Sequence, residues 1–143
     1  MKGQADPGGM QHTRYPFEKT SRFSKSLDGL GNRDHQIVLA KLIRFEREWT
    51  IDVPSNELNS TWDFKFVRSD QRCRKFKVMQ LRITSDLRVF ITVVDPHRRV
   101  YYLDVHRKAG GGAQSDAIRR ACDLASRIWE ETDGSYEPRR ADL

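Results

Sequence analysis

The side chains best suited to chemistry are arginines, lysines and a histidine in the middle of the chain. Residues 65–108 hold twelve of the 26 Lys and Arg residues, but only four of the 20 Asp and Glu residues. The whole chain of 143 residues has a formal net charge of +6, so the positive excess lies entirely in this segment. A basic excess confined to one segment favours a nucleic-acid contact. The alternative is a solvated basic face without a partner.

Arginine beside histidine suits the cleavage of RNA without a metal ion. The 2′-hydroxyl attacks the adjacent phosphate, so negative charge builds up on the phosphorane and protons must move. Arg82 and Arg88 can stabilise this charge by bidentate pairing with phosphate oxygens, and His106 can transfer a proton. Each also has a structural interpretation, because a histidine near a strand end is often hydrogen-bonded and Asp104 can pair with either arginine.

Other side chains of the same segment are expected to bind RNA. Tyr102 or Phe90 can stack on an unpaired base. The basic residues expected to contact RNA phosphates are Lys65, Arg68, Arg74, Lys75 and Lys77. The run from Arg72 to Lys77 can equally be the solvated tip of a hairpin.

Hydrophobic periodicity predicts the elements that position these side chains. Helices are predicted over about residues 20–30, 35–49 and 116–131. Strands are predicted over residues 13–19, 62–67, 75–84, 87–94 and 99–106. The order is therefore strand, helix, helix, four strands, helix.

This order predicts an α+β fold built on a single antiparallel sheet. Short turns join the last four strands into a meander. The two N-terminal helices and the C-terminal helix are expected to pack on one face of the sheet, leaving the other face open. Arg88 and Phe90 alternate with the apolar residues of their strand, so we expect them on the open face. Tyr102 and His106 are expected on the same face from the neighbouring strand.

Cysteine and histidine spacing predicts neither a disulfide framework nor a metal centre. Cys73 and Cys122 are therefore expected to be reduced, as in a cytoplasmic protein. The four histidines lack metal-ligand spacing, and no metal or other cofactor is expected. Because no stretch reaches the ~20 apolar residues of a membrane span, no membrane partner is expected.

One domain is predicted, over residues 13–132. Residues 1–12 are polar, rich in glycine and without periodicity, which predicts a disordered leader. Residues 133–143 are predicted to form a polar tail.

The segment LRITSDLRVFITVVDPHRRVYYLDVHRK, residues 81–108, resembles the RelE/ParE toxin superfamily. The shared parts are a strand ending in Leu81-Arg82, a polar turn, a strand opened by Arg88, an acidic turn at Asp95 and a strand ending in His106-Arg107-Lys108. The order of elements over residues 13–131 is similar to the family topology. The helix after the glycines is closer to the HigB-like pattern.

The resemblance implies a microbial RNase-like fold and the toxin of a bacterial type II toxin–antitoxin system. RelE-like members cleave mRNA in the ribosomal A site without a metal, so the implied partners are mRNA, the ribosome and a cognate antitoxin. It also implies that Arg82, Arg88 and the basic pair Arg107 and Lys108 contact the scissile phosphate and nearby RNA. With His106, these residues form the predicted catalytic set.

Two departures from the family pattern leave other functions open. RelE-like members carry lysines where this chain has Val78 and Gln80, and a C-terminal tyrosine where it has residues 110–115. Either His106 replaces a missing acid or base, or the activity is weak or absent. The alternatives are a ParE-like toxin that inhibits DNA gyrase and a non-catalytic RNA-binding module of the same fold.

Overall fold

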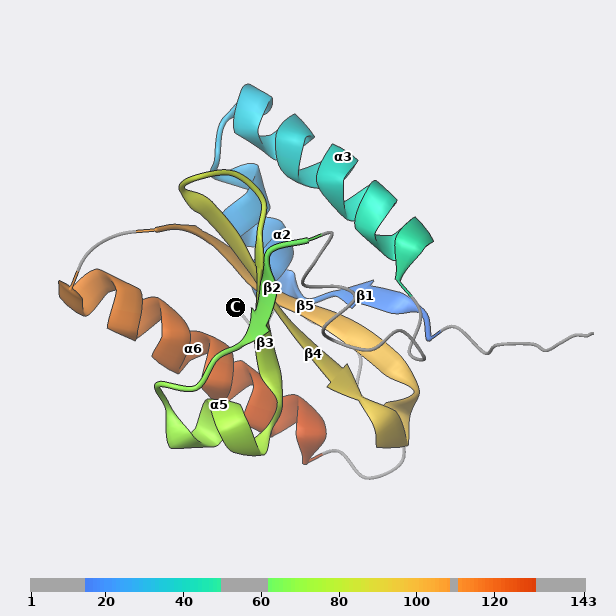
Figure 1. Ribbon diagram of the computed structural model, residues 1–143, viewed down its shortest axis with the longest axis vertical. Helices are drawn as coiled ribbons and strands as arrows, with labels where there is room; N and C mark the ends of the chain where they lie inside the picture. Colours follow the sequence, from blue (N-terminus) through green and yellow to red (C-terminus); the bar gives the residue numbers. More distant parts are fainter. Residues whose placement is uncertain (1–14, 50–61, 109–110, 131–143) are drawn as a thin grey trace, which may run out of the picture.

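The computed structural model describes residues 15–49, 62–108 and 111–130 (Figure 1). The predicted leader, residues 1–12, and the predicted tail, residues 133–143, lie outside the described residues. The elements are β1 (Phe17–Lys19), α2 (Ser21–Asp28), α3 (Asn32–Glu48), β2 (Phe64–Phe66), α5 (Gln71–Lys75), β3 (Val78–Arg82), β4 (Leu87–Val94), a 3-10 turn η1 (Asp95–His97), β5 (Arg99–Arg107) and α6 (Gly111–Trp129).

Within these residues, five strands form one sheet in the order β1-β5-β4-β3-β2. The predicted α+β class and the single sheet are confirmed. The sheet is mixed rather than antiparallel, because β1 pairs with β5 in parallel, with Phe17 beside Val100. The strands from β2 to β5 are antiparallel neighbours. Short connections join β3 to β4 and β4 to β5, whereas α5 lies between β2 and β3. The direction of β1 is not set by a short connection, since α2 and α3 lie between β1 and the next strand in the chain.

Helices cover both faces of the sheet, so the prediction of an open face is wrong. Figure 1 shows α3 and α6 on opposite sides of the strands. Val89 and Ile91 belong to the apolar cluster that contains the buried residues of α2 and α3. Phe90 and Val94 belong to a second cluster together with α6. Strand β4 is apolar on both sides, which is typical of a strand buried between two helical layers.

A β-bulge in β5 changes which side chains share a face. Phe90 pairs with Asp104, whereas Ile91 pairs with Tyr102, so Leu103 is an additional residue in β5. An extra residue inverts the alternation beyond it. Tyr102 and Val105 therefore pack in the same cluster as α2 and α3, while Leu103 packs with α6.

The bulge places Tyr102, which was predicted to stack on an RNA base, in the buried layer beneath α2 and α3. Its side chain is 0% exposed. The ring stacks between Phe17 and Phe23, at centroid distances of 5.5 and 5.2 Å. Its hydroxyl donates a hydrogen bond to Glu46 Oε2 at 2.7 Å. Tyr102 is thus a core residue, and the predicted stacking role is wrong because no face of its ring is accessible.

Two helices differ from the sequence prediction. The run interpreted from the sequence as a possible hairpin tip is largely the short helix α5, whose N-cap Asp70 accepts a hydrogen bond from the backbone amide of Arg72 at 2.8 Å. Side-chain capping of this kind stabilises a helix that is too short to show a hydrophobic periodicity in the sequence. Helix α6 begins at Gly111, earlier than predicted, which brings Gln114 into the helix.

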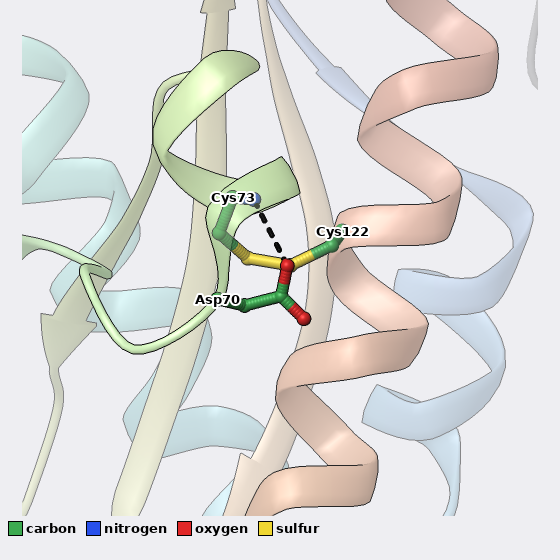
Figure 2. Close-up of side chains that lie close together, drawn as sticks. All are labelled: Asp70, Cys73 and Cys122. Atoms are coloured by element: carbon green, nitrogen blue, oxygen red, sulfur yellow. Dashed lines mark hydrogen bonds between the residues drawn. A yellow bond between two sulfur atoms is a disulfide. The ribbon is translucent and has the colours of Figure 1, made fainter.

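Cys73 of α5 and Cys122 of α6 form a disulfide bond, so the prediction of reduced cysteines is wrong (Figure 2). Their separation of 49 positions conceals this proximity in the sequence. Sγ atoms of both cysteines and a carboxylate oxygen of Asp70 lie within 4.8 Å of one another. The sulfurs are bonded to each other and Asp70 Oδ1 accepts from the amide of Cys73, so these residues act as a cross-link and a helix cap.

Among the described residues, no helix combines the length and apolar character needed to cross a membrane.

Candidate nucleic-acid interface

A hollow of about 300 Å³ lies where β2, β3 and β4 meet the end of β5 and the start of α6. We call it the basic hollow. Its lining residues are Asp63, Lys65, Gln80, Arg82, Arg88, Lys108 and Gln114. Among these described residues four carry positive charge and one carries negative charge. The hollow therefore attracts an anion, and four of its residues were predicted as site residues from the sequence.

Arg82 and Arg88 occupy directly opposite positions on β3 and β4. The Arg82 guanidinium donates to Asp63 Oδ2 at 3.1 Å, and about half of its side chain is exposed. Arg88 is only 6% exposed. Its Nη1 donates to the backbone oxygens of Thr84 at 2.8 Å and Ser85 at 3.2 Å. Arg88 thus holds the turn between the strands while its charge remains at the wall of the hollow.

Burial and a like charge both act on the Arg88 guanidinium. Its pKa is lowered from the ordinary value, first by loss of solvent and then by the positive charge of Arg82. Asp63 and Asp86 oppose this shift. A guanidinium is still protonated at any physiological pH. A phosphate in the hollow would reduce the repulsion between the two arginines, so the site is electrostatically suited to an oxyanion.

His106 lies beside Arg88 but outside the basic hollow. The two residues are paired across β4 and β5. The imidazole stacks on the Phe90 ring with 4.7 Å between centroids, and its Nδ1 donates to the backbone oxygen of Arg107 at 3.1 Å. Its Nε2 is buried without a hydrogen-bond partner among the described residues. Burial lowers the pKa of His106, which favours the neutral ring.

The neighbouring side chains of Arg107 and Lys108 contact different residues. Its guanidinium forms ion pairs with Asp34 and Asp86, the second at 3.0 Å. These acids raise the pKa of Arg107, with Asp34 contributing most. Lys108, the next residue, lines the basic hollow. Of the predicted basic pair at the end of β5, the structure brings only Lys108 together with Arg82 and Arg88.

The residues predicted to bind RNA divide into two groups. Lys65 lines the basic hollow, and both Lys65 and Arg68 line a second hollow beside it. Arg74 and Lys75 lie in α5, and Lys77 follows it. Arg74 Nη1 donates to the backbone oxygen of Arg68 at 2.6 Å, and the Lys75 ammonium lies 5.3 Å from the Phe76 ring centroid. Arg74, Lys75 and Lys77 lie outside both hollows.

Sequence reasoning missed three residues of the basic hollow: Asp63, Gln80 and Gln114. Asp63 precedes β2 and was treated only as part of a strand. Gln114 lies 32 positions beyond Arg82 in the chain and reaches the hollow through the packing of α6. The alternation of β3 places Gln80 on the same side as Arg82, so the sequence pattern could have identified Gln80 as a residue of the hollow.

Fold and site together define an α+β protein with a cationic hollow at one end of its sheet. The chain matches no protein-family profile, and no curated protein matches it either. Among solved structures, it is similar to the isolated RelE toxin of E. coli, with a TM-score of 0.46 and 16% sequence identity. The similarity covers 74% of this chain and 97% of that one. A likeness this distant assigns neither activity nor residue roles.

Proposed function

We propose that this protein binds RNA at the basic hollow and cleaves it, as the toxin of a type II toxin–antitoxin system. The observation that carries the proposal is the opposed pair Arg82 and Arg88, with Lys65 and Lys108 around the same hollow. Several cations converging on one small hollow match the charge of a phosphodiester. The resemblance of residues 81–108 to RelE-like toxins supports RNA as the polyanion.

The proposed reaction is an intramolecular transfer of the phosphoryl group. The 2′-oxygen bonds to phosphorus, the bond from phosphorus to the 5′-oxygen breaks, and a 2′,3′-cyclic phosphate and a 5′-hydroxyl result. Arg82 and Arg88 stabilise the phosphorane. The Asp63 carboxylate takes the proton of the 2′-hydroxyl, and the Lys108 ammonium gives a proton to the leaving oxygen. Solvent then restores both groups.

In this proposal His106 and Arg107 have supporting roles. His106 packs against Phe90 and faces Arg88 across the strands, which suits a positioning residue. Arg107 is bound to Asp34 and Asp86. Neither residue is assigned to the phosphate.

The proposed setting is translated mRNA on the ribosome, in the cytoplasm, with no metal or cofactor taking part. In that compartment the disulfide between Cys73 and Cys122 is an exception to the usual reduced state of cysteines. A cognate antitoxin would inhibit the protein by placing an acidic segment over the basic hollow, because opposite charges are matched at such interfaces. Co-purification with the product of an adjacent gene tests this partner.

Induced expression together with a purified translation system tests the activity. Wild-type protein should arrest growth and cut mRNA, and Arg82→Gln should do neither. Arg107→Gln is the matched control and should behave as wild type. RNA binding without any product would support a non-catalytic RNA-binding module instead. A DNA-damage response with intact mRNA would support a gyrase inhibitor and overturn the proposal.

A further inference from the structure

A second hollow, of about 420 Å³, adjoins the basic hollow between β2 and α6. We call it the adjoining hollow. Its lining residues are Lys65, Phe66, Val67, Arg68, Ser69, Gln80, Gln114 and Ile118. Lys65, Gln80 and Gln114 line both hollows. The two hollows are therefore neighbours, and they differ in chemistry.

The adjoining hollow has apolar walls where the basic hollow has charges. Val67 is 8% exposed and belongs to the apolar cluster beneath α6, and Ile118 packs against the same cluster. Flat heterocycles bind to apolar walls of this kind, whereas phosphates remain with cations and water. In a nucleotide one sugar joins the base to the phosphate, so adjacent polar and apolar hollows match its two ends.

Gln114 is placed at the boundary of the two hollows with an unused acceptor. Its Oε1 is buried and has no hydrogen-bond partner among the described residues. A buried carbonyl oxygen without a donor costs free energy, and a ligand that supplies a donor recovers it. A glutamine amide forms two hydrogen bonds with adenine, accepting from the N6 amino group and donating to N7.

We propose that the adjoining hollow binds a nucleobase next to the phosphate in the basic hollow, and that Gln114 makes this subsite prefer adenine. The base lies against Val67 and Ile118, and the Gln114 amide meets its amino edge. This inference rests on the proposed binding of RNA at the basic hollow. It adds a specificity-determining residue that takes no part in the chemistry.

Short single-stranded RNAs with 2′-O-methyl groups, which cannot be cleaved by 2′-oxygen attack, provide the test. Three oligonucleotides carry adenine, uracil or unsubstituted purine at the varied position. Wild-type protein should bind the adenine form about tenfold more tightly than the other two, as one bidentate contact allows. Purine keeps the ring and N7 but lacks the amino group, so it isolates the contact with Oε1.

Variants then test whether Gln114 causes the preference for adenine. Gln114→Leu should bind the three oligonucleotides equally, at the affinity wild type has for uracil. Gln71→Leu changes an exposed glutamine of α5 and should keep the preference. Arg82→Gln should weaken all three alike, because it acts on the phosphate.

The outcomes separate this inference from the proposed function. Equal binding of the three oligonucleotides by wild type, or an unchanged preference in Gln114→Leu, overturns the adenine subsite and leaves RNA binding intact. Failure of wild type to bind any of the three overturns both.

Discussion

Arg82 and Arg88 face each other across β3 and β4, with two positive side chains at one cross-strand pair. Like charges directly opposite on a sheet are destabilising. Here Arg82 lowers the pKa of Arg88, second only to burial. Such a repulsive pair lowers the stability of the free protein. It is expected at a site where a bound anion offsets the repulsion.

Removing one charge of this pair should separate stability from binding. We expect Arg82→Gln to leave the free energy of unfolding within about 0.5 kcal/mol of wild type, because the lost ion pair with Asp63 is exposed and repulsion is relieved. RNA affinity should fall at least tenfold. Urea unfolding and fluorescence anisotropy measure the two effects. Arg107→Gln is the control and should retain RNA affinity. A loss of RNA affinity equal to that of Arg82→Gln would show that Arg107 also binds the RNA.

Binding of RNA should depend strongly on salt. If Lys65, Arg82, Arg88 and Lys108 all neutralise phosphates, a plot of log affinity against log salt concentration should have a slope of about −3 for single strands. Lys65→Gln should make this slope shallower by about 0.7. Titrations at four salt concentrations determine both values. A slope near zero would show that the hollow does not bind the RNA backbone.

The disulfide should contribute substantially to stability. Cys73 and Cys122 are 49 positions apart, and closing a loop of that length stabilises a fold by about 4 kcal/mol in the chain-entropy treatment. The double variant Cys73→Ala with Cys122→Ala should therefore unfold at lower urea concentration. Dithiothreitol should have the same effect on wild type and none on the double variant. An unchanged unfolding midpoint in dithiothreitol would contradict a cross-link between α5 and α6.

Acid should destabilise the fold through His106. Burial lowers the pKa of this group below its ordinary value of 6.5, so the unfolded chain binds the proton more readily. The stability that the neutral ring provides is present above pH 6.5 and is lost as the pH falls below it. His106→Phe keeps the stack on Phe90 and should lose less stability than wild type between pH 7.5 and 5.5.

Urea unfolding at the two pH values measures this difference. The comparison with His106→Phe is needed because burial raises the pKa of Asp104, which acts in the opposite direction. Identical pH dependence in the two proteins would show that His106 is not protonated on unfolding.

The sequence by itself determined the order of the elements except α5, and much of the charge pattern. Strand β4 has the predicted bounds, residues 87–94, because its alternation and flanking turns are local signals. Local alternation also placed Arg82 and Arg88 on one side of neighbouring strands, and the short connection between the strands, residues 83–86, sets their register. These properties depend on residues close together in the chain, and the periodicity of the sequence reveals them.

Only the tertiary structure decided which of those side chains form a site. One bulge residue in β5 turns Tyr102 into the core, and two acids on other elements bind Arg107. Docking of α6 closes the second face, joins Cys73 to Cys122 and brings Gln114 to Arg82 and Arg88. Such contacts join residues far apart in the chain, and their energies depend on packing between layers. No local pattern of residues records that packing.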